Sequence, residues 1–201
     1  MHLMLHNLPP SKLSAPRLSP FQLPRPQLVE RMRDAGDVRL ILLRAPAGFG
    51  KTTAMLQLAE HQAAAGVVVG WLNLDASDND LGRFLAHFDA AVAGVAPRLD
   101  ARSPEPDLLE LIDRIAASAT RFTLFLDDFE AVESSTVLDL IRQIVDNLPP
   151  GWQFVIGSRI VPGLGLGRLR AGGSCLKSGW GICAFRREKP PRFCANGGPF
   201  R

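Results

Sequence analysis

Residues 45–53 read Ala-Pro-Ala-Gly-Phe-Gly-Lys-Thr-Thr and carry the clearest chemical signal in this chain of 201 residues. Gly48 and Gly50 would let the backbone curl so that several N–H groups point inward, and a following helix would add its N-terminal dipole. Lys51 would then reach the β- and γ-phosphates of a nucleotide, and the Thr52 hydroxyl would bind magnesium. The segment therefore predicts a site for ATP with Mg²⁺.

One position departs from the usual phosphate-loop pattern, G-x-x-x-x-G-K-[ST], because Ala45 stands where the first glycine is expected. Alanine is small enough to turn tightly, so the departure is tolerable. We expect Phe49 and Thr53 to complete the nucleotide-binding loop, with the Thr53 backbone N–H near the α-phosphate. The competing interpretation is a chance Gly-Lys-Thr at the start of a helix, which the preceding strand and following helix disfavour.

Two carboxylates follow the apolar run 122–126. Asp127 is expected to hold magnesium opposite Thr52, directly or through water. Asp128 is expected to polarise the attacking water, since phosphoryl transfer needs mainly positioning and charge stabilisation. The alternative is a solvated acidic turn that caps the next helix. The location of this pair, about 75 residues after the phosphate loop, favours the nucleotide interpretation.

Arg159 directly follows another apolar run, 153–157, and is a candidate to sense or neutralise the γ-phosphate. The alternative is an ordinary surface arginine. An acidic cluster at 75–80 favours helix capping over chemistry. The four histidines show no spacing typical of metal ligands.

Hydrophobic periodicity predicts the strands and helices that position these residues. Apolar runs that favour strands alternate with segments that favour helices, which is typical of an α/β fold with a parallel sheet covered on both faces. In such folds the site lies beyond the carboxyl ends of the strands, where the polar residues above are found. The expected strands are 38–43, 67–74, 122–126 and 153–157, and the expected helices are 27–35, 54–65, 81–95, 107–119 and 136–147.

Composition and charge narrow the class of protein. The chain is 46% hydrophobic and 21% charged, as a globular protein is. It contains neither a stretch of roughly 20 apolar residues nor a signal-peptide pattern, so we expect a cytoplasmic protein with no membrane partner. The net charge is +3, yet residues 171–201 alone carry six basic and one acidic side chain. Because the excess positive charge lies in this last segment, it is only weak support for nucleic-acid binding by the folded part of the chain.

Three regions are expected. Residues 1–26 contain six prolines and predict an extended leader. Residues 27–170 would form the phosphate-loop nucleotide-binding domain. Residues 171–201 lack periodicity and hold Cys175, Cys183 and Cys194, at spacings unlike metal-ligand pairs. We expect a disordered basic tail there, with a shifted reading frame as the leading hypothesis for its origin and a divergent native tail as the alternative.

Several stretches together resemble the MalT-like family of large ATP-dependent LuxR-type transcriptional activators. Their order and spacing agree with that family over about residues 12–170, and Ala-Pro-Ala-Gly is its common loop opening. The matching stretches are Lys12-Leu-Ser-Ala-Pro-Arg-Leu18, Arg25-Pro26, the loop 45–53, Trp71-Leu-Asn-Leu-Asp75, Ser77-Asp-Asn-Asp80, Leu126-Asp-Asp128, Leu148-Pro-Pro150 and Ser158-Arg159.

The resemblance implies a signal-transduction ATPase of the STAND type, inactive with ADP and self-associating with ATP and an inducer. It also implies that Arg25 approaches the adenine. The family's sensor and helix-turn-helix regions have no counterpart in these 201 residues, so we expect a truncated N-terminal ATP-binding switch with slow ATPase activity at most. We expect no sequence-specific DNA binding by this segment.

Two alternatives stay open at this level. One is a stand-alone P-loop kinase or hydrolase whose substrate loop is 97–107, although no arginine-rich lid is evident. A guanine-specific enzyme is disfavoured, because the sequence has no Asn-Lys-x-Asp segment. The other alternative is a non-functional remnant that does not fold stably.

Overall fold

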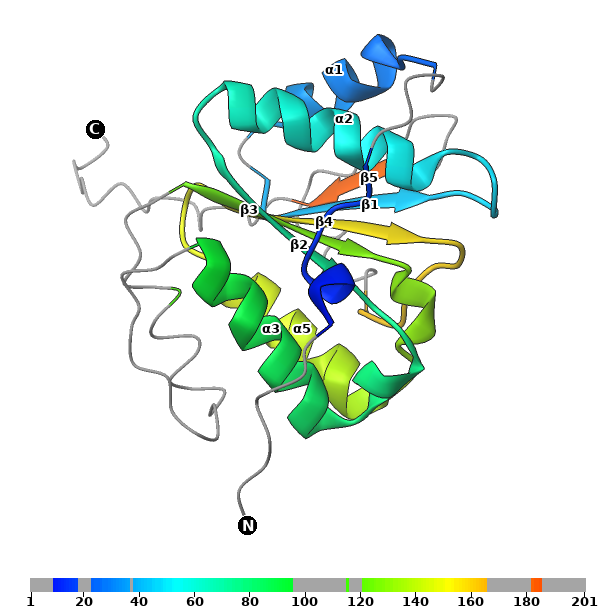
Figure 1. Cartoon of the computed structure of the whole chain (residues 1–201), viewed down its shortest axis with the longest axis vertical. Coiled ribbons are helices and arrows are strands. Elements are labelled where there is room, and N and C mark those ends of the chain that lie inside the picture. Colours follow the sequence, from blue (N-terminus) through cyan, green and yellow to red (C-terminus); the bar gives the residue numbers. More distant parts are fainter. Residues whose placement is uncertain are drawn as a thin grey trace, which may run out of the picture.

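A five-stranded sheet organises the molecule. The structure, a computed structural model, describes residues 9–17, 23–36, 38–95, 115, 121–165 and 182–185. The strands lie in the order β2-β3-β4-β1-β5; the first four are parallel, and β5 is antiparallel to β1 (Figure 1). Their bounds are β1 Leu40–Arg44, β2 Val68–Asn73, β3 Phe122–Asp127, β4 Trp152–Ser158 and β5 Ile182–Phe185.

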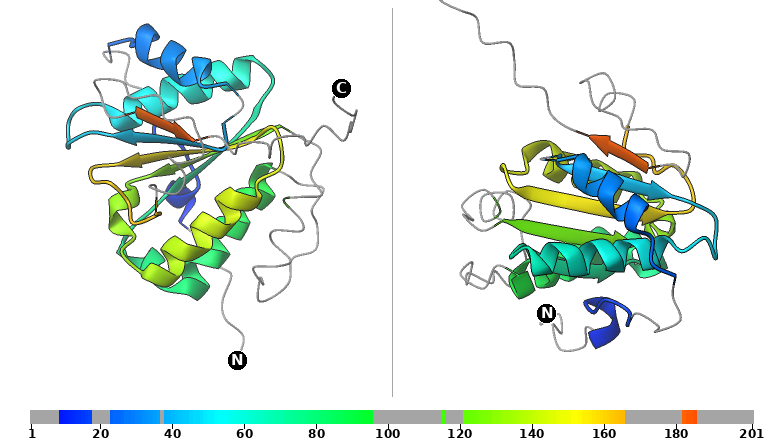
Figure 2. Two further views of the ribbon diagram at one scale, coloured as in Figure 1. Left: turned by 180° about the vertical axis from the view of Figure 1, so that it is seen from behind. Right: turned by 90° about the horizontal axis from the view of Figure 1, so that it is seen from above.

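Helices cover both faces of this sheet, as Figures 1 and 2 show. Helices α1 and α2 lie on one face, and α3 and α5 lie on the other. The predicted α/β fold with a parallel sheet between helical layers is therefore confirmed. The helices are α1 Pro26–Asp34, α2 Lys51–Ala64, α3 Leu81–Val95 and α5 Ser135–Asn147, with short 3-10 turns η1 Pro10–Lys12, η2 Ala76–Asn79 and η3 Phe129–Ala131.

Strand β1 shows why the apolar runs become central strands. Its side chains alternate between two cores: Leu40 and Leu42 pack toward α3 and α5, whereas Ile41 and Leu43 pack toward α1 and α2. A strand buried on both faces needs apolar residues at every position, which gives a continuous run instead of an alternating pattern.

The predicted element boundaries agree with the structure to within about three residues. The largest shift is at the start of α2, which begins at Lys51 and not at 54, because Gly50 ends the loop in a left-handed conformation. The predicted helix 107–119 and the connection 97–106 lie outside the described residues, apart from Ile115, which is buried in the core. No helix in the described part of the chain is long and apolar enough to cross a membrane.

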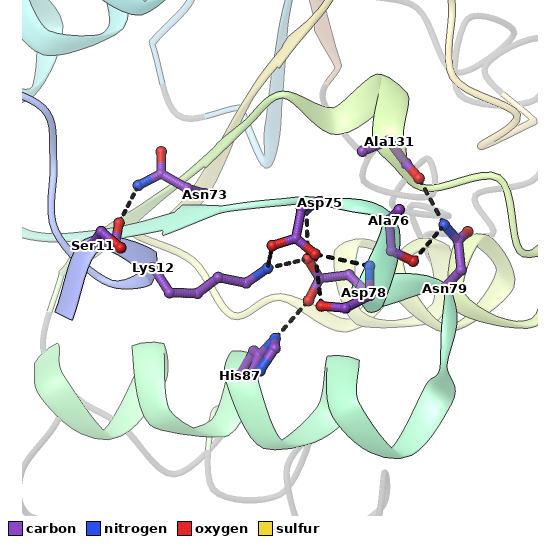
Figure 3. Close-up of polar contacts among 10 residues, drawn as sticks. Ser11, Lys12, Asn73, Asp75, Ala76, Asp78, Asn79, His87 and Ala131 are labelled. Atoms are coloured by element: carbon purple, nitrogen blue, oxygen red, sulfur yellow. Dashed lines mark hydrogen bonds and ion pairs between the residues drawn. The ribbon is translucent and has the colours of Figure 1, made fainter. Parts of the chain in front are cut away.

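The leader departs from the expectation of an extended segment, because residues 9–17 dock against the edge of the sheet. Lys12 is 5% exposed, and its Nζ lies 2.6 Å from a carboxylate oxygen of both Asp75 and Asp78 (Figure 3). His87 Nδ1 lies 2.6 Å from the other oxygen of Asp78, which is fully buried. The sequence gives no periodicity here because the docking depends on one lysine whose partners are more than 60 residues away.

Two further contacts join this leader to its surroundings. The Asn73 amide on edge strand β2 donates to the carbonyl oxygens of Ser11 and Ser14. Asp75 and Asp78 also form a reciprocal capping box around η2, which confirms the capping role predicted for the acidic cluster. The same carboxylates therefore cap a turn and bind the leader.

We expect Lys12→Met to destabilise the fold by about 3–5 kcal/mol, because it removes the ammonium and leaves the buried Asp78 carboxylate with His87 and a backbone N–H as its polar partners. Urea unfolding followed by circular dichroism measures this. Arg17→Met is the matched control, since Arg17 is an exposed cation in the same segment. Equal stabilities of the two variants would contradict the assignment.

The ion pair between Lys12 and Asp75 predicts that the stability of the fold depends on pH in acid. The hydrogen bond from Lys12 is the main cause that lowers the pKa of Asp75 to about 2, from an ordinary value of 3.8. A lowered pKa means that this contribution to stability is complete above pH 3.8 and is lost as the pH falls toward 2. Lys12→Met should therefore flatten the loss of stability over this range.

Strand β5 corrects the expectation of a wholly unstructured tail after residue 170. Residues Ile182–Phe185 pair with β1 and extend the sheet by one antiparallel strand. The hydrophobic pattern of the segment does not predict this strand. The strand forms by pairing with the edge of β1 that has no other partner strand in the sheet. The rest of 171–201 lies outside the described residues.

Candidate functional site

The phosphate loop connects β1 to α2 at the carboxyl end of the sheet. Gly48 and Gly50 take positive φ angles of 77° and 74°, a region that strongly favours glycine. Ala45 is not among the described residues with positive φ, and its N–H donates to the carbonyl of Ser158 on β4. The loop thus needs glycine at 48 and 50 but not at 45, which explains the departure from the usual pattern.

Lys51 is the first residue of α2, and its Nζ donates to the loop carbonyl of Ala45 at 3.0 Å. A longer contact of 3.5 Å joins it to the carbonyl of Pro46. The ammonium therefore lies against the loop that is predicted to bind phosphate. Thr52 and Thr53 follow in the first turn, where backbone N–H groups have no acceptor within the helix and attract anions.

Thr52 and Asp127 meet across the site, although 75 positions separate them in the sequence. The Thr52 hydroxyl donates to Asp127 Oδ2 at 2.6 Å, and Asp127 is 2% exposed. Burial raises the pKa of Asp127, against the opposing effects of the Thr52 hydrogen bond and the nearby charge of Lys51. A buried carboxylate beside a hydroxyl is a set of oxygen ligands that suits Mg²⁺.

These two groups do not form a complete protein cage for a metal. Among the residues that the structure describes, no group of three or more His, Cys, Asp or Glu side chains is arranged to hold a metal ion. Magnesium in nucleotide sites is typically held by one or two protein groups together with substrate phosphates and water. The donor set here fits that arrangement.

Asp128 has an unusual backbone conformation. Its φ of 52° is the only positive value at a non-glycine position in the described part of the chain, and the residue is exposed. Its N–H donates to Oδ1 of Asp127 at 3.0 Å. Aspartate tolerates this region better than most residues do, and such strain is concentrated at functional sites.

Arg159 follows β4, the strand that lies between β1 and β3 in the sheet. Its Nε lies 2.6 Å from Oε1 of Glu130, and its backbone N–H donates to Oε2 at 3.0 Å. The predicted γ-phosphate residue therefore lies at the same edge as the loop and Asp127, held by an acid that the sequence analysis missed. The only sign of Glu130 in the sequence is that an acidic residue lies two positions after Asp128.

Gly157 is a second residue that the sequence analysis missed. A Cβ placed on it would lie 2.8 Å from Oδ1 of Asp127 and 2.5 Å from Sδ of Met55. Glycine at this position therefore provides the space in which the Asp127 carboxylate sits.

We expect Gly157→Ala to weaken magnesium-dependent ATP binding about tenfold by displacing the Asp127 carboxylate. Crowding at Met55 should also cost about 1–3 kcal/mol of stability. Calorimetric titration with ATP at high and low Mg²⁺ separates the two effects. Gly94→Ala is the control, because a Cβ there meets nothing within 4 Å. Unchanged magnesium dependence in Gly157→Ala would refute the role.

Arg25 lies beside the phosphate loop. Its guanidinium Nη2 is 3.3 Å from the point where a Cβ on Gly50 would lie, and its backbone N–H donates to Gln57 on α2. Arg25 and Leu28 border both the hollow around the loop and a neighbouring cavity of about 390 Å³ at the start of α1. That cavity is lined by Pro24, Arg25, Pro26, Gln27, Leu28 and Arg31.

No family model matches the chain. The HTH-type transcriptional regulator MalT of Yersinia pestis (strain Pestoides F) is 29% identical over 195 residues, which cover 92% of this chain and 21% of that protein. This chain is similar to the MalT regulators. MalT of Vibrio cholerae is 28% identical with the same coverage, so the chain spans about a fifth of the length of the MalT proteins it matches.

The MalT match also corrects one boundary. Because it covers 92% of the chain, it leaves out only about 16 of the 201 residues and must extend well into 171–201. The prediction that the resemblance ends near residue 170 is therefore wrong. The shifted reading frame loses the support of that boundary, and the hypothesis now depends on the charge, cysteine and glycine content of residues 171–201.

Two solved structures show partial similarity to this chain. The Aeropyrum pernix ORC2 protein has a TM-score of 0.46 at 15% identity, covering 66% of this chain and 39% of its own. Cdc6p from Pyrobaculum aerophilum has a TM-score of 0.46 at 19% identity, covering 76% of this chain and 42% of its own.

Proposed function

We propose that this chain is the ATP-binding switch domain of a MalT-like transcriptional regulator. The observation that carries the proposal is the 2.6 Å contact between Thr52, at the start of α2, and Asp127, at the end of β3. This contact supports the proposal, because the two residues expected to hold magnesium lie against each other next to the loop 45–53.

The phosphates would lie against the N-terminus of α2. Lys51 would exchange its contacts with the loop carbonyls for the β- and γ-phosphates, where a full negative charge attracts it more strongly. The Thr52 hydroxyl and the Asp127 carboxylate would hold Mg²⁺, which when bound neutralises charge on the phosphates. Binding magnesium would also relieve the cost of burying Asp127, whose raised pKa reflects that burial.

Asp128 is proposed to orient the attacking water, and Arg159 to stabilise charge on the γ-phosphate. Asp128 is exposed at the carboxyl end of β3, next to the magnesium ligand. Its left-handed backbone fixes the direction in which the chain leaves the strand. We propose slow turnover, as suits a switch whose output depends on which nucleotide is bound.

The nucleoside is proposed to occupy the cavity of about 390 Å³ at the start of α1. That volume falls within the range of small-molecule sites. Arg25 borders both this cavity and the loop, so it would lie between base and phosphates. Its planar guanidinium is suited to stacking on a base.

The regulatory role rests on the similarity to MalT. We propose a cytoplasmic protein in which ATP promotes self-association of the regulator, with DNA contacted through helix-turn-helix residues outside these 201. The segment 97–107, which a stand-alone kinase would use for its substrate, lies outside the described residues. No observation in the site favours that alternative.

A thermal-shift experiment tests the proposal most directly. The chain is heated with ATP and Mg²⁺, with GTP and Mg²⁺, with ATP and EDTA, and without ligand. We expect ATP with Mg²⁺ to stabilise most, by about 2.7 kcal/mol at a hundred times its Kd. Equal shifts with GTP would contradict the adenine assignment, and no shift in any arm would contradict nucleotide binding.

A further inference from the structure

Glu130 contacts Arg159 at two points. One carboxylate oxygen accepts the backbone N–H of Arg159 at 3.0 Å, and the other lies 2.6 Å from the guanidinium Nε. This second oxygen is buried and has no aligned hydrogen-bond donor among the described residues, so the contact is an ion pair and not a hydrogen bond. Glu130 thus accepts a hydrogen bond from the Arg159 backbone and forms an ion pair with its guanidinium.

Because Glu130 lies against Nε, the two Nη groups of the guanidinium stay available for another acceptor. The Arg159 side chain is 54% exposed, and within the described chain it makes no hydrogen bond or ion pair other than this one. A guanidinium offers five N–H donors in a planar fork that matches phosphate oxygens. An arginine held by its backbone, with its donors open at the edge beside the phosphate loop, is ready to receive an oxyanion.

Glu130 itself is on a rigid support. It is 18% exposed, and its neighbour Phe129 is fully buried in the core. The side-chain amide of Asn79 donates to the carbonyl of Ala131 at 2.7 Å, which ties η3 to η2. A loosely placed exposed ion pair contributes little, but a carboxylate on an anchored turn can define where an arginine lies.

We propose that Glu130 is a positioning residue that aims Arg159 at the γ-phosphate and so makes the domain distinguish ATP from ADP. The inference rests on the proposed function, since it takes the site to be one for ATP. Glu130 contacts no phosphate itself. Its effect passes through the backbone and guanidinium of Arg159, and it matters only for the nucleotide that carries a third phosphate.

The test compares ATP and ADP affinities by calorimetry in the presence of Mg²⁺. Glu130→Ala should weaken ATP binding about tenfold and leave ADP binding nearly unchanged. Arg159→Ala should do the same, and the double variant should lose no more than either single variant, because the two residues act as one unit. Glu130→Gln keeps an acceptor for the backbone N–H and should recover part of the ATP preference.

Glu133→Ala is the matched control, since Glu133 is an exposed acid three positions away. Additive losses in the double variant, or an unchanged ratio of ATP to ADP affinity in both Glu130→Ala and Glu130→Gln, would overturn the inference. A lower melting temperature with equal losses for both nucleotides would indicate a structural role only and would also overturn it. If Lys51→Ala binds ATP as the parent does, the proposed function itself fails, which is a distinguishable result.

Discussion

Replacing Lys51 with alanine is expected to weaken ATP binding at least about tenfold, with little effect on the fold. The only hydrogen bonds that the ammonium donates within the described residues go to the loop carbonyls of Ala45 and Pro46, and the side chain is partly exposed. Its removal should therefore cost little in the free protein. In the complex it removes the single cation that the loop directs at the β- and γ-phosphates.

Isothermal calorimetry measures the affinity, and circular dichroism checks the fold. Arg83→Ala is the control, because Arg83 is an exposed cation on α3, on the opposite face of the sheet. Lys51→Arg adds a second comparison: a planar fork cannot replace a compact ammonium in the loop, so affinity should stay low. ATP affinity equal to that of the parent in Lys51→Ala would refute the phosphate-loop assignment.

The parts of the candidate site that can be predicted from the sequence are those encoded locally. Gly48, Gly50 and Lys51 belong to one short segment in which composition and order imply a conformation and a charge. Asp127 is predictable because a buried strand that ends in an acid is unusual, and parallel strands all end at one edge. The 2.6 Å contact between Thr52 and Asp127 follows from the sheet order β2-β3-β4-β1, which the sequence analysis did not assign.

The parts that it misses depend on pairs that are distant in sequence. Glu130 becomes informative only beside Arg159, and Gly157 only beside the carboxylate of Asp127. In the sequence Lys12 is one of several basic residues in a proline-rich leader, and only the structure shows that it pairs with Asp75 and Asp78. In each case the residue type is common, so local pattern carries no signal and only tertiary contact reveals the role.

Asp127→Asn is expected to change two measurable properties in opposite directions. Burial raises the pKa of Asp127, so at neutral pH the folded state must hold an ionised carboxylate in an unfavourable environment. For a raised pKa this cost is present above the folded pKa and disappears as the pH falls below it. Asparagine removes the charge and keeps an acceptor for the Asp128 N–H, so the nucleotide-free protein should melt at a higher temperature than the parent.

The same substitution should weaken magnesium-dependent ATP binding roughly 10–100-fold, because the Thr52 hydroxyl alone is a poor ligand for Mg²⁺. Titrations at high and low Mg²⁺, with melting curves at neutral pH, measure both effects on one variant. Asp128→Asn provides the contrast: Asp128 is exposed and adjacent, so its loss should leave magnesium-dependent binding intact and slow any hydrolysis. A lower melting temperature for Asp127→Asn would show that the carboxylate stabilises the fold instead of destabilising it. Hydrolysis by Asp128→Asn at the parent rate would exclude its role in positioning water.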